Sequence, residues 1–297
     1  MQQFAKIGVF LTGAPADAGA IAHAGLIAEI TGTERILCLC DCETYAPEGH
    51  PDAAGVEAEV RKHLPAAVHD RVEVRLFADN SLAQTLRVAR DEALDLLVKG
   101  RRLPANELAK PTLFTRLVRK APCTTLVVPG MTRVHMTRLL VPVDFSDHSR
   151  LALETALDFA RAAGAHVGQT PQVVVLTTFA VEYGYAKTGV TLTEAAAQIE
   201  AATCRKLKQF LADVDTSGVE FDSVCMCSER TPAAIHEVAA ARRMDMIVVG
   251  SRGASASVVA ILGSTAEAVV VSAALPALVV KKKGETTGLL NALLAEM

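Results

Sequence analysis

The chain has 297 residues, of which 51% are hydrophobic and 21% charged. This composition excludes a disordered chain and a small disulfide scaffold, and the length predicts two domains. The formal net charge is −3, so the chain offers no overall positive field that could hold a nucleic acid. Its 7 cysteines, an odd number, are typical of a reducing cytoplasm, where we expect the protein to be.

Neither of the two most apolar stretches predicts a membrane span. Residues 7–11 are too few for the apolar part of a secretory leader and are expected to form the first strand. Residues 258–280 are interrupted by Gly263, Glu267 and Pro276, and a carboxylate at the centre of a membrane costs about 3 kcal/mol. We therefore expect a buried helix and a buried strand there, and no membrane partner.

Three cysteines of the first half, Cys38, Cys40 and Cys42, are spaced by two and are expected to share one face of a strand. A zinc site built from them would need a fourth ligand and usually has cysteine pairs separated by two to four residues. We therefore interpret them as buried structural cysteines.

The second half of the chain repeats the first. Three pairs of segments correspond: 6–12 with 138–144, 95–100 with 245–250, and 121–128 with 274–280. Such a repeat at similar spacing predicts a duplication. We expect one domain at residues 1–130, a second at 137–283 and a C-terminal tail at 284–297.

Strands and helices are expected to alternate along the second half. The predicted strands are 139–143, 173–178, 219–227, 244–249 and 277–281, and the predicted helices are 151–163, ended by Gly164, 193–214, capped by Thr193, one that begins at Thr231, and 265–273. With only 4% aromatic residues, the cores are expected to be aliphatic. This alternation predicts an α/β fold of two tandem doubly wound parallel five-stranded sheets, with ligand crevices at the carboxyl ends of the strands.

The most informative segment is the loop at residues 250–265, between a predicted strand and a predicted helix. Its glycines let phosphate oxygens approach the backbone, and the helix after Gly263 offers free N–H groups. The hydroxyls of Ser264 and Thr265 and the charge of Arg252 add donors. The alternative is a flexible connection in which Ser264 is an ordinary N-cap. The loop matches neither a Walker A motif nor a dinucleotide-binding fingerprint.

The spacing of this loop matches a known family. The pattern G-x2-G-x9-G-[ST] is met by Gly250, Gly253, Gly263 and Ser264, and in it the sequence resembles the universal stress protein family. The resemblance extends to LVPVDFSDHS at 140–149, to RTPAAIHEVA at 230–239 and to PALVV at 276–280. It covers 137–282, and the first half resembles the family more weakly.

The resemblance implies a Rossmann-like sheet, of the adenine nucleotide α-hydrolase type, that binds ATP, with or without Mg²⁺. By position, Asp144 would meet the adenosine with Pro142 and Val143 beside it, and Thr178 would lie where the family contacts adenine. The positions expected around the ribose and phosphates are Gly250, Arg252, Gly253, Gly263, Ser264 and Thr265. The alternative for Asp144 is a residue that only starts a turn.

The first half departs from this pattern. Thr12 stands in the place of Asp144, Gly100 is followed by Arg101, Arg102 and Leu103 instead of a second close glycine, and Pro111 and Thr112 replace Gly263 and Ser264. We therefore expect a degenerate domain that binds no nucleotide. The charges of Arg101, Arg102 and Lys110 are expected to be solvated rather than to hold an anion.

No catalytic constellation is recognisable. His148 and His236 have no Ser or Cys nucleophile at a known spacing. The resemblance therefore implies an ATP-binding regulatory protein of the stress response rather than an enzyme. Two alternatives remain open: slow ATP hydrolysis, and a protein-interaction module with an empty crevice.

The last strand of each half suggests how the halves associate. In the family, the last strands of two domains pair across a dimer interface, and a duplication would make this pairing internal, as a pseudo-dimer; a homodimer of two chains is the alternative. Lys281, Lys282 and Lys283 are expected to protect a sheet edge. Four leucines of the tail, Leu289, Leu290, Leu293 and Leu294, are expected on one face of a short helix.

Overall fold

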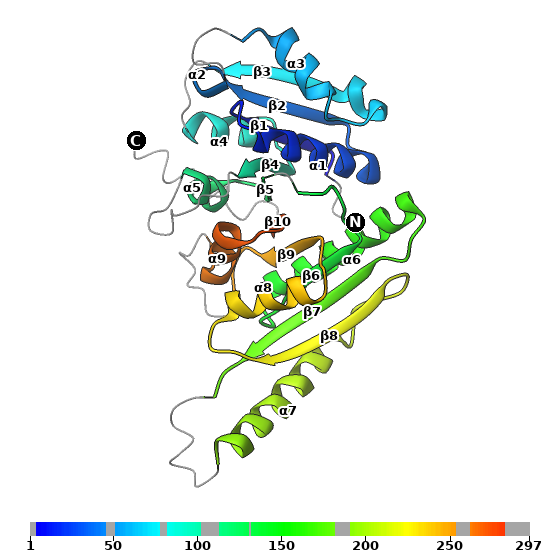
Figure 1. Cartoon of the computed structure of the whole chain (residues 1–297), viewed down its shortest axis with the longest axis vertical. Coiled ribbons are helices and arrows are strands. Elements are labelled where there is room, and N and C mark those ends of the chain that lie inside the picture. Colours follow the sequence, from blue (N-terminus) through cyan, green and yellow to red (C-terminus); the bar gives the residue numbers. More distant parts are fainter. Residues whose placement is uncertain are drawn as a thin grey trace.

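The strands of the chain form one continuous sheet (Figure 1). The computed structural model describes residues 4–45, 51–77, 82–101, 113–130, 132–181, 191–253 and 262–282. Within these residues the strands lie in the order β3-β2-β1-β4-β5-β10-β9-β6-β7-β8. All neighbours are parallel except β5 and β10, which are antiparallel. The predicted α/β class with a mostly parallel sheet is therefore confirmed.

The elements alternate in both halves. The strands are β1 (Lys6–Leu11), β2 (Arg35–Asp41), β3 (Val72–Phe77), β4 (Leu96–Arg101), β5 (Thr124–Pro129), β6 (Arg138–Pro142), β7 (Gln172–Phe179), β8 (Glu220–Cys227), β9 (Met246–Gly250) and β10 (Ala277–Val280). The helices are α1 (Ala16–Thr31), α2 (Cys42–Tyr45), α3 (Ala53–Arg61), the 3-10 helix η1 (Ala66–Arg71), α4 (Leu82–Asp91), α5 (Leu113–Lys120), α6 (Asp147–Val167), α7 (Leu192–Leu211), α8 (Thr231–Ala241) and α9 (Ser264–Ser272).

Helices cover the sheet on both faces. Helices α1, α3, α6 and α7 pack on one face, around a single hydrophobic cluster that runs through both halves. Helices α4, α5, α8 and α9 cover the other face over two clusters. The strands inside the sheet are mainly aliphatic and almost fully buried, as the low aromatic content predicts, whereas the edge strands β3 and β8 are half-buried or exposed.

The two halves match in topology and in their turns. The order β3-β2-β1-β4-β5 of the first half is repeated as β8-β7-β6-β9-β10 in the second. Three pairs of residues at equivalent turns share a left-handed backbone: Gly13 (φ 69°) and Phe145 (φ 67°), Gly32 and Gly168 (both φ 66°), and Ala93 and Arg243 (both φ 50°). The residue type differs at two of these three turns, but the backbone conformation stays the same.

Both halves have the same close approach of a strand to a helix, between β4 and α1 in the first half and between β9 and α6 in the second. A Cβ added to Gly100 would lie 2.4 Å from the carbonyl oxygen of Ala16, and one added to Gly250 would lie 2.7 Å from that of His148. Glycine is therefore required at both strand ends so that the helix can start against the strand.

Some predicted element ends are wrong. Helix α6 continues through Gly164 to Val167 and ends at Gly168. The missing side chain of Gly164 leaves room for the chain that returns from the helix, since a Cβ there would lie 2.6 Å from the carbonyl oxygen of Gln169. Helix α7 is capped by Thr191, in a capping box with Glu194, rather than by Thr193.

The cysteine prediction holds in part. Cys38 and Cys40 are buried in β2, but the strand ends at Asp41 and Cys42 begins α2, so the three do not share one strand face. Within the described part of the chain, no group of three or more His, Cys, Asp or Glu side chains is placed to hold a metal ion.

Two predictions about basic residues are wrong, because β10 lies in the middle of the sheet. Lys281 does not protect an edge: it is 3% exposed, and its Nζ donates hydrogen bonds to the carbonyl oxygens of Val118 (2.7 Å) and Ala121 (2.6 Å) at the end of α5. Arg101 is 9% exposed rather than solvated, and donates to carbonyl oxygens at the end of α9. Predictions about Arg102, Lys110, Lys283 and the tail fall outside the described residues.

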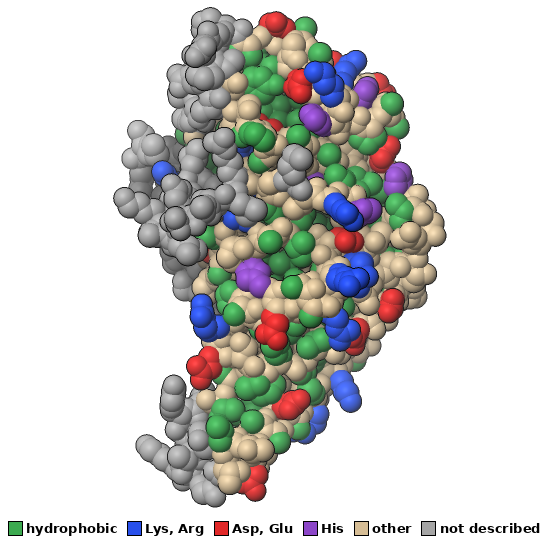
Figure 2. All heavy atoms as spheres, in the orientation of Figure 1, with side chains coloured by type: hydrophobic (Ala, Val, Ile, Leu, Met, Phe, Trp, Pro, Cys, Tyr) green, Lys and Arg blue, Asp and Glu red, His purple; other side chains and the backbone are tan. Residues whose placement is uncertain are grey.

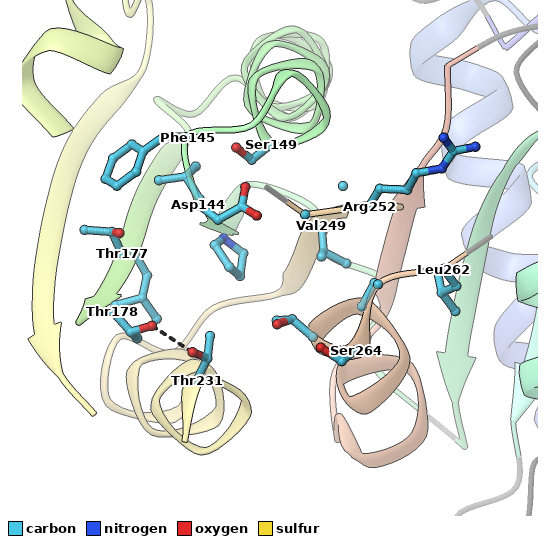
Figure 3. A pocket seen from close by; sticks show the side chains of 18 residues that line it. Asp144, Phe145, Ser149, Thr177, Thr178, Thr231, Val249, Arg252, Leu262 and Ser264 are labelled. Carbon is cyan, nitrogen blue, oxygen red and sulfur yellow. Dashed lines mark hydrogen bonds between the residues drawn. The ribbon is translucent and has the colours of Figure 1, made fainter. Parts of the chain in front are cut away.

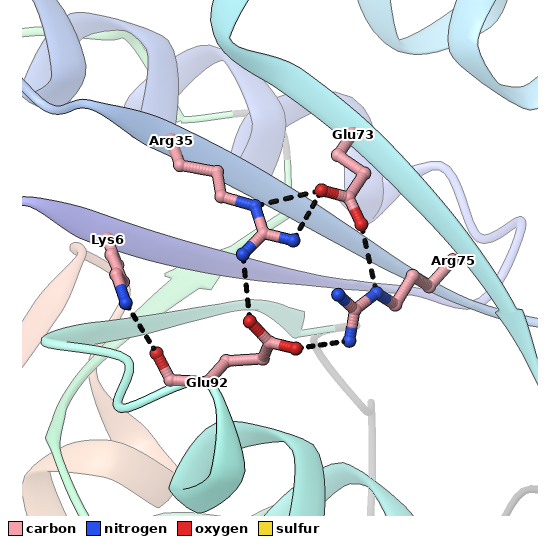
Figure 4. Close-up of polar contacts among 5 residues, drawn as sticks. All are labelled: Lys6, Arg35, Glu73, Arg75 and Glu92. Atoms are coloured by element: carbon pink, nitrogen blue, oxygen red, sulfur yellow. Dashed lines mark hydrogen bonds and ion pairs between the residues drawn. The ribbon is translucent and has the colours of Figure 1, made fainter.

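On the face seen in Figure 2, acidic and basic side chains of the described residues are interspersed. Arg35 of β2 and Arg75 of β3 both bind Glu73 of β3 and Glu92, which follows α4, in a four-membered ion-pair network (Figure 4). No helix among the described elements combines the length and the hydropathy needed to cross a membrane.

Candidate functional site

A cavity of about 600 Å³ opens at the carboxyl ends of β6, β7 and β9, beside the start of α9 (Figure 3). At this point the chain order of the sheet reverses, because β7 lies on one side of β6 and β9 on the other. Parallel α/β sheets bind ligands at this kind of switch point, and the volume lies in the range of small-molecule sites.

All the residues predicted from the sequence line this one cavity: Pro142, Val143, Asp144, Thr178, Gly250, Arg252, Gly253, Gly263, Ser264 and Thr265. They come from segments more than 120 positions apart, which the sheet brings together. Their roles toward a ligand stay predictions. Residues 254–261 of the loop lie outside the described part of the chain.

Sequence reasoning missed several lining residues: Phe145, Ser149, Leu176, Thr177, Thr231, Val249, Leu262 and Ala266. Most are neighbours of predicted ones. Thr231 is different, since it reaches the cavity from the start of α8, where its hydroxyl lies 2.8 Å from that of Thr178 (Figure 3). The sequence does show that Thr231 precedes a proline at a helix start. That its hydroxyl meets Thr178 follows only from the pairing of β7 with β8.

Asp144 has two roles divided between its oxygens. Oδ1 accepts hydrogen bonds from the backbone N–H (3.1 Å) and the hydroxyl (2.6 Å) of Ser146, which in turn caps α6. The turn-starting interpretation is therefore correct for this oxygen. Oδ2 points to the nearby Gly253, where an added Cβ would lie 2.6 Å from it, and the side chain as a whole is exposed. A carboxylate held in this way can accept hydrogen bonds from a ligand without losing its turn.

The start of α9 forms the opposite wall. Gly263 is the N-cap and supplies no side-chain acceptor, so the alternative that Ser264 caps the helix is wrong. The Gly263 N–H donates to the carbonyl of Ser251 (2.8 Å), which ties the two ends of the loop together. The first-turn N–H groups of α9 therefore face the cavity without a side-chain cap, an arrangement that favours anions.

The side chain of Arg252 points away from that of Asp144. Figure 3 shows the Arg252 side chain extending away from Asp144 and from the threonines of β7 and α8. The two predicted ends of the site, carboxylate and cation, are thus spatially separate.

Phe145 forms a wall of the cavity that is supported from α7. It is a bulky residue in the left-handed region (φ 67°), a conformation that costs energy and persists only when the surroundings hold it. Its ring makes an edge contact with Phe210, with 5.7 Å between centroids, and the Lys206 ammonium lies 4.5 Å from its centroid. Helix α7 therefore holds one side of the cavity in place.

In the first half, charged side chains contact Thr12, which stands in the place of Asp144. The Thr12 N–H donates to Asp17 Oδ2 (2.6 Å), and the Lys99 ammonium lies 4.3 Å from the centroid of Phe10. Burial lowers the pKa of Lys99 to about 8 and raises that of Asp17. These groups satisfy one another where the second half has Asp144.

Comparisons with known proteins place the second half in a family. No curated protein sequence matches the chain. A putative universal stress protein from Pseudomonas aeruginosa UCBPP-PA14 shares the fold, with 18% identity and a TM-score of 0.66 over 100% of this chain and 99% of that one. A universal stress protein from Archaeoglobus fulgidus DSM 4304 has 15% identity and a TM-score of 0.61 over 95% of this chain and 100% of that one. A functionally unknown protein from Pseudomonas aeruginosa PAO1 has 17% identity and a TM-score of 0.69 over 100% of this chain and 99% of that one. Residues 136–281 match the family described as the Universal stress protein family. The second half of this chain, residues 136–281, is therefore a universal stress protein domain.

Proposed function

We propose that the second half binds one adenine nucleotide, ATP with or without Mg²⁺, and that the protein acts as a nucleotide-dependent regulator in a stress response. The observation that carries the proposal is the meeting, in one cavity, of an exposed carboxylate at the end of β6 with the uncapped start of α9. A nucleotide has matching ends, since its nucleoside donates hydrogen bonds and its phosphates are anionic.

The nucleoside would lie between β6 and β7. Asp144 Oδ2, which lies beside Gly253, would accept from ribose hydroxyls while Oδ1 keeps its hydrogen bonds to Ser146. Leu176 and Val249 supply apolar surface for the base, and the backbone beside Thr178 supplies polar groups at its edge.

The phosphates would lie along the loop toward α9. Gly253 and Gly263 leave room for phosphate oxygens to reach backbone N–H groups, and the start of α9 contributes partial positive charge worth roughly 0.3 to 2 kcal/mol for each contact. Arg252, whose side chain extends away from Asp144, belongs to this end of the site.

The first half serves as a nonbinding partner in this proposal. We interpret the chain as a tandem duplication whose internal β5–β10 pairing makes a pseudo-dimer. The repeated strand order and the matching left-handed turns support this interpretation.

Calorimetric titration of Asp144→Ala with adenosine, AMP and ATP tests the proposal. Since the carboxylate belongs to the nucleoside end, all three ligands should lose affinity by similar factors, about tenfold or about 1.4 kcal/mol. Asp147→Ala is the matched control, because Asp147 is an exposed carboxylate in the first turn of α6 that does not line the cavity. If the parent protein neither binds ATP nor melts at a higher temperature with it, the nucleotide proposal is wrong and the interaction-module alternative is favoured.

A further inference from the structure

Two cysteines meet where α7 packs on the last strand of the sheet. Helix α7 contacts β7 and β8 at the end of the molecule (Figure 1). Its sheet-facing stripe includes the buried Leu207 and the half-buried Leu211, and Cys204 lies on the same side, half-buried, one turn before Leu207. The helix thus presents a thiol toward the sheet.

Cys225 presents the second thiol from β8. Side chains alternate along this strand: Val224 and Met226 pack toward α8, whereas Phe221 and Cys225 pack into the cluster that contains Leu207. Cys204 and Cys225 thus lie on the facing sides of the contact between α7 and β8, and Cys204 is near enough to raise the pKa of Cys225. Both thiols are partly exposed, whereas Cys38, Cys40 and Cys123 are buried.

We propose that Cys204 and Cys225 are a redox-active dithiol, a modification site at which a hydroperoxide closes a disulfide between α7 and β8. In the first step the Cys204 thiolate attacks the peroxide oxygen, which gives a sulfenic acid and releases water or an alcohol. In the second step the Cys225 sulfur displaces the hydroxyl group, which leaves as water with the thiol proton. The two thiols lose two electrons in total, and the peroxide gains them.

The environment of the pair assigns the order of these steps. The pKa of the Cys225 thiol is raised to about 12, chiefly by burial and in part by the neighbouring Cys204. The buried Cys225 thiol is the poorer nucleophile, because the thiolate is the attacking form, and Cys204 is therefore assigned as the attacking sulfur. Cys225, held beside it, resolves the sulfenic acid.

The disulfide would fix α7, which supports the wall of the cavity. Cys204 precedes Lys206 by two positions and Phe210 by less than two turns, and both of those residues contact Phe145. Closing the loop between α7 and β8 should raise the melting temperature of the chain by about 5 °C, because the loop loses freedom in the unfolded state. The dithiol proposal itself does not depend on nucleotide binding.

The test is peroxide treatment of the full chain, followed by intact mass and peptide mapping. The parent and the control variant Cys227→Ser should each lose two hydrogens in mass, form a peptide that links positions 204 and 225, and return to the starting mass with dithiothreitol. Cys227 is the informative control, since it is exposed and lies two positions from Cys225 on the same strand.

Two further variants test the order of the steps. Cys225→Ser should stop at a Cys204 sulfenic acid that dimedone captures, and Cys204→Ser should form no disulfide and no dimedone adduct at Cys225. The proposal is overturned if the parent gains oxygen at Cys204 while Cys225 stays a free thiol. It is also overturned if the link from Cys225 forms to Cys227 or survives in Cys204→Ser.

Discussion

The carboxylate of Asp144 and the α-carbon of Gly253 face each other so closely that a Cβ added to Gly253 would lie 2.6 Å from Asp144 Oδ2. Carbon and oxygen atoms do not approach to this distance without bonding, so one of them would have to move. The mobile group is the end of the Asp144 side chain. Glycine at position 253 is therefore needed for the place of the carboxylate rather than for the fold.

Gly253→Ala should displace the Asp144 carboxylate and weaken adenosine and ATP alike, by about tenfold or about 1.4 kcal/mol. Calorimetric titration with both ligands measures the effect. Gly55→Ala is the control, because a Cβ at Gly55 in α3 would have its nearest contact at 3.4 Å, with a flexible Asp52 carboxylate. Full affinity in Gly253→Ala would mean that the position of Asp144 does not matter for the ligand.

Gly263→Ala should separate the phosphate end from the nucleoside end. A Cβ at Gly263 has its nearest atom at 3.4 Å, the nitrogen of Gly253, so the fold should tolerate it. The methyl group would nevertheless occupy space that a phosphate needs near the backbone. We expect ATP affinity to fall by at least tenfold, about 1.4 kcal/mol, while adenosine affinity is nearly unchanged. Equal affinities of variant and parent for ATP would reduce the loop to a connection.

Arg101→Ala should destabilise the contact between the halves. The Arg101 guanidinium donates to the carbonyls of Val271 and Ala273 at the end of α9, where a positive charge also matches the helix dipole. Its loss should lower the free energy of unfolding by about 3 kcal/mol, since charged hydrogen bonds are worth roughly 1.5 to 3 kcal/mol each.

Urea unfolding measures this loss, with Arg87→Ala as the control. Arg87 is an exposed arginine in the middle of α4, and its truncation should cost little. A cost for Arg101→Ala no larger than that for Arg87→Ala would contradict the role of Arg101 between the halves.

His23 should make stability depend on pH. It is 0% exposed in α1, its Nδ1–H donates to the carbonyl of Gly19 (2.7 Å), and its Nε2 finds no hydrogen-bond partner among the residues that the structure describes. Burial lowers the pKa of His23 below its ordinary value of 6.5, and the nearby His135 lowers it further. The unfolded chain therefore binds the proton more readily, and the free energy of unfolding should fall as pH drops below about 6.5.

Unfolding by urea at pH 7.5 and pH 5.5 tests the sign. The parent should lose more stability between these pH values than His23→Leu, whereas His63→Gln, which changes a more exposed histidine, should follow the parent. A parent and a His23→Leu variant with the same pH dependence would exclude His23 as its source.

Much of this architecture could be predicted because it depends on local pattern. Short aliphatic runs between turn residues identified most strands, and the glycine spacing of 250–263 selected residues that do line one cavity. Helix ends were harder to predict, since Gly164 and Thr193 are residue types common at helix ends. Helix α6 nevertheless continues through Gly164, which leaves room for the returning chain, and a capping box at Thr191 starts α7 before Thr193.

Long-range contacts were not predictable from local pattern. Lys281 and Arg101 look like surface charges in the sequence, and only the antiparallel pairing of β5 with β10 buries them against helix ends. The bond between Thr178 and Thr231 and the support of Phe145 by α7 likewise join segments that the sequence keeps apart.

Calorimetric titration of the full chain with ATP tests the central claim most directly, because it reports both binding and the number of sites. We predict one site per chain, with an ATP affinity that falls by at least tenfold in Gly263→Ala and by about tenfold in Asp144→Ala and is unchanged in Asp147→Ala. Two equivalent sites per chain, or one site that both cavity variants leave unchanged, would contradict it.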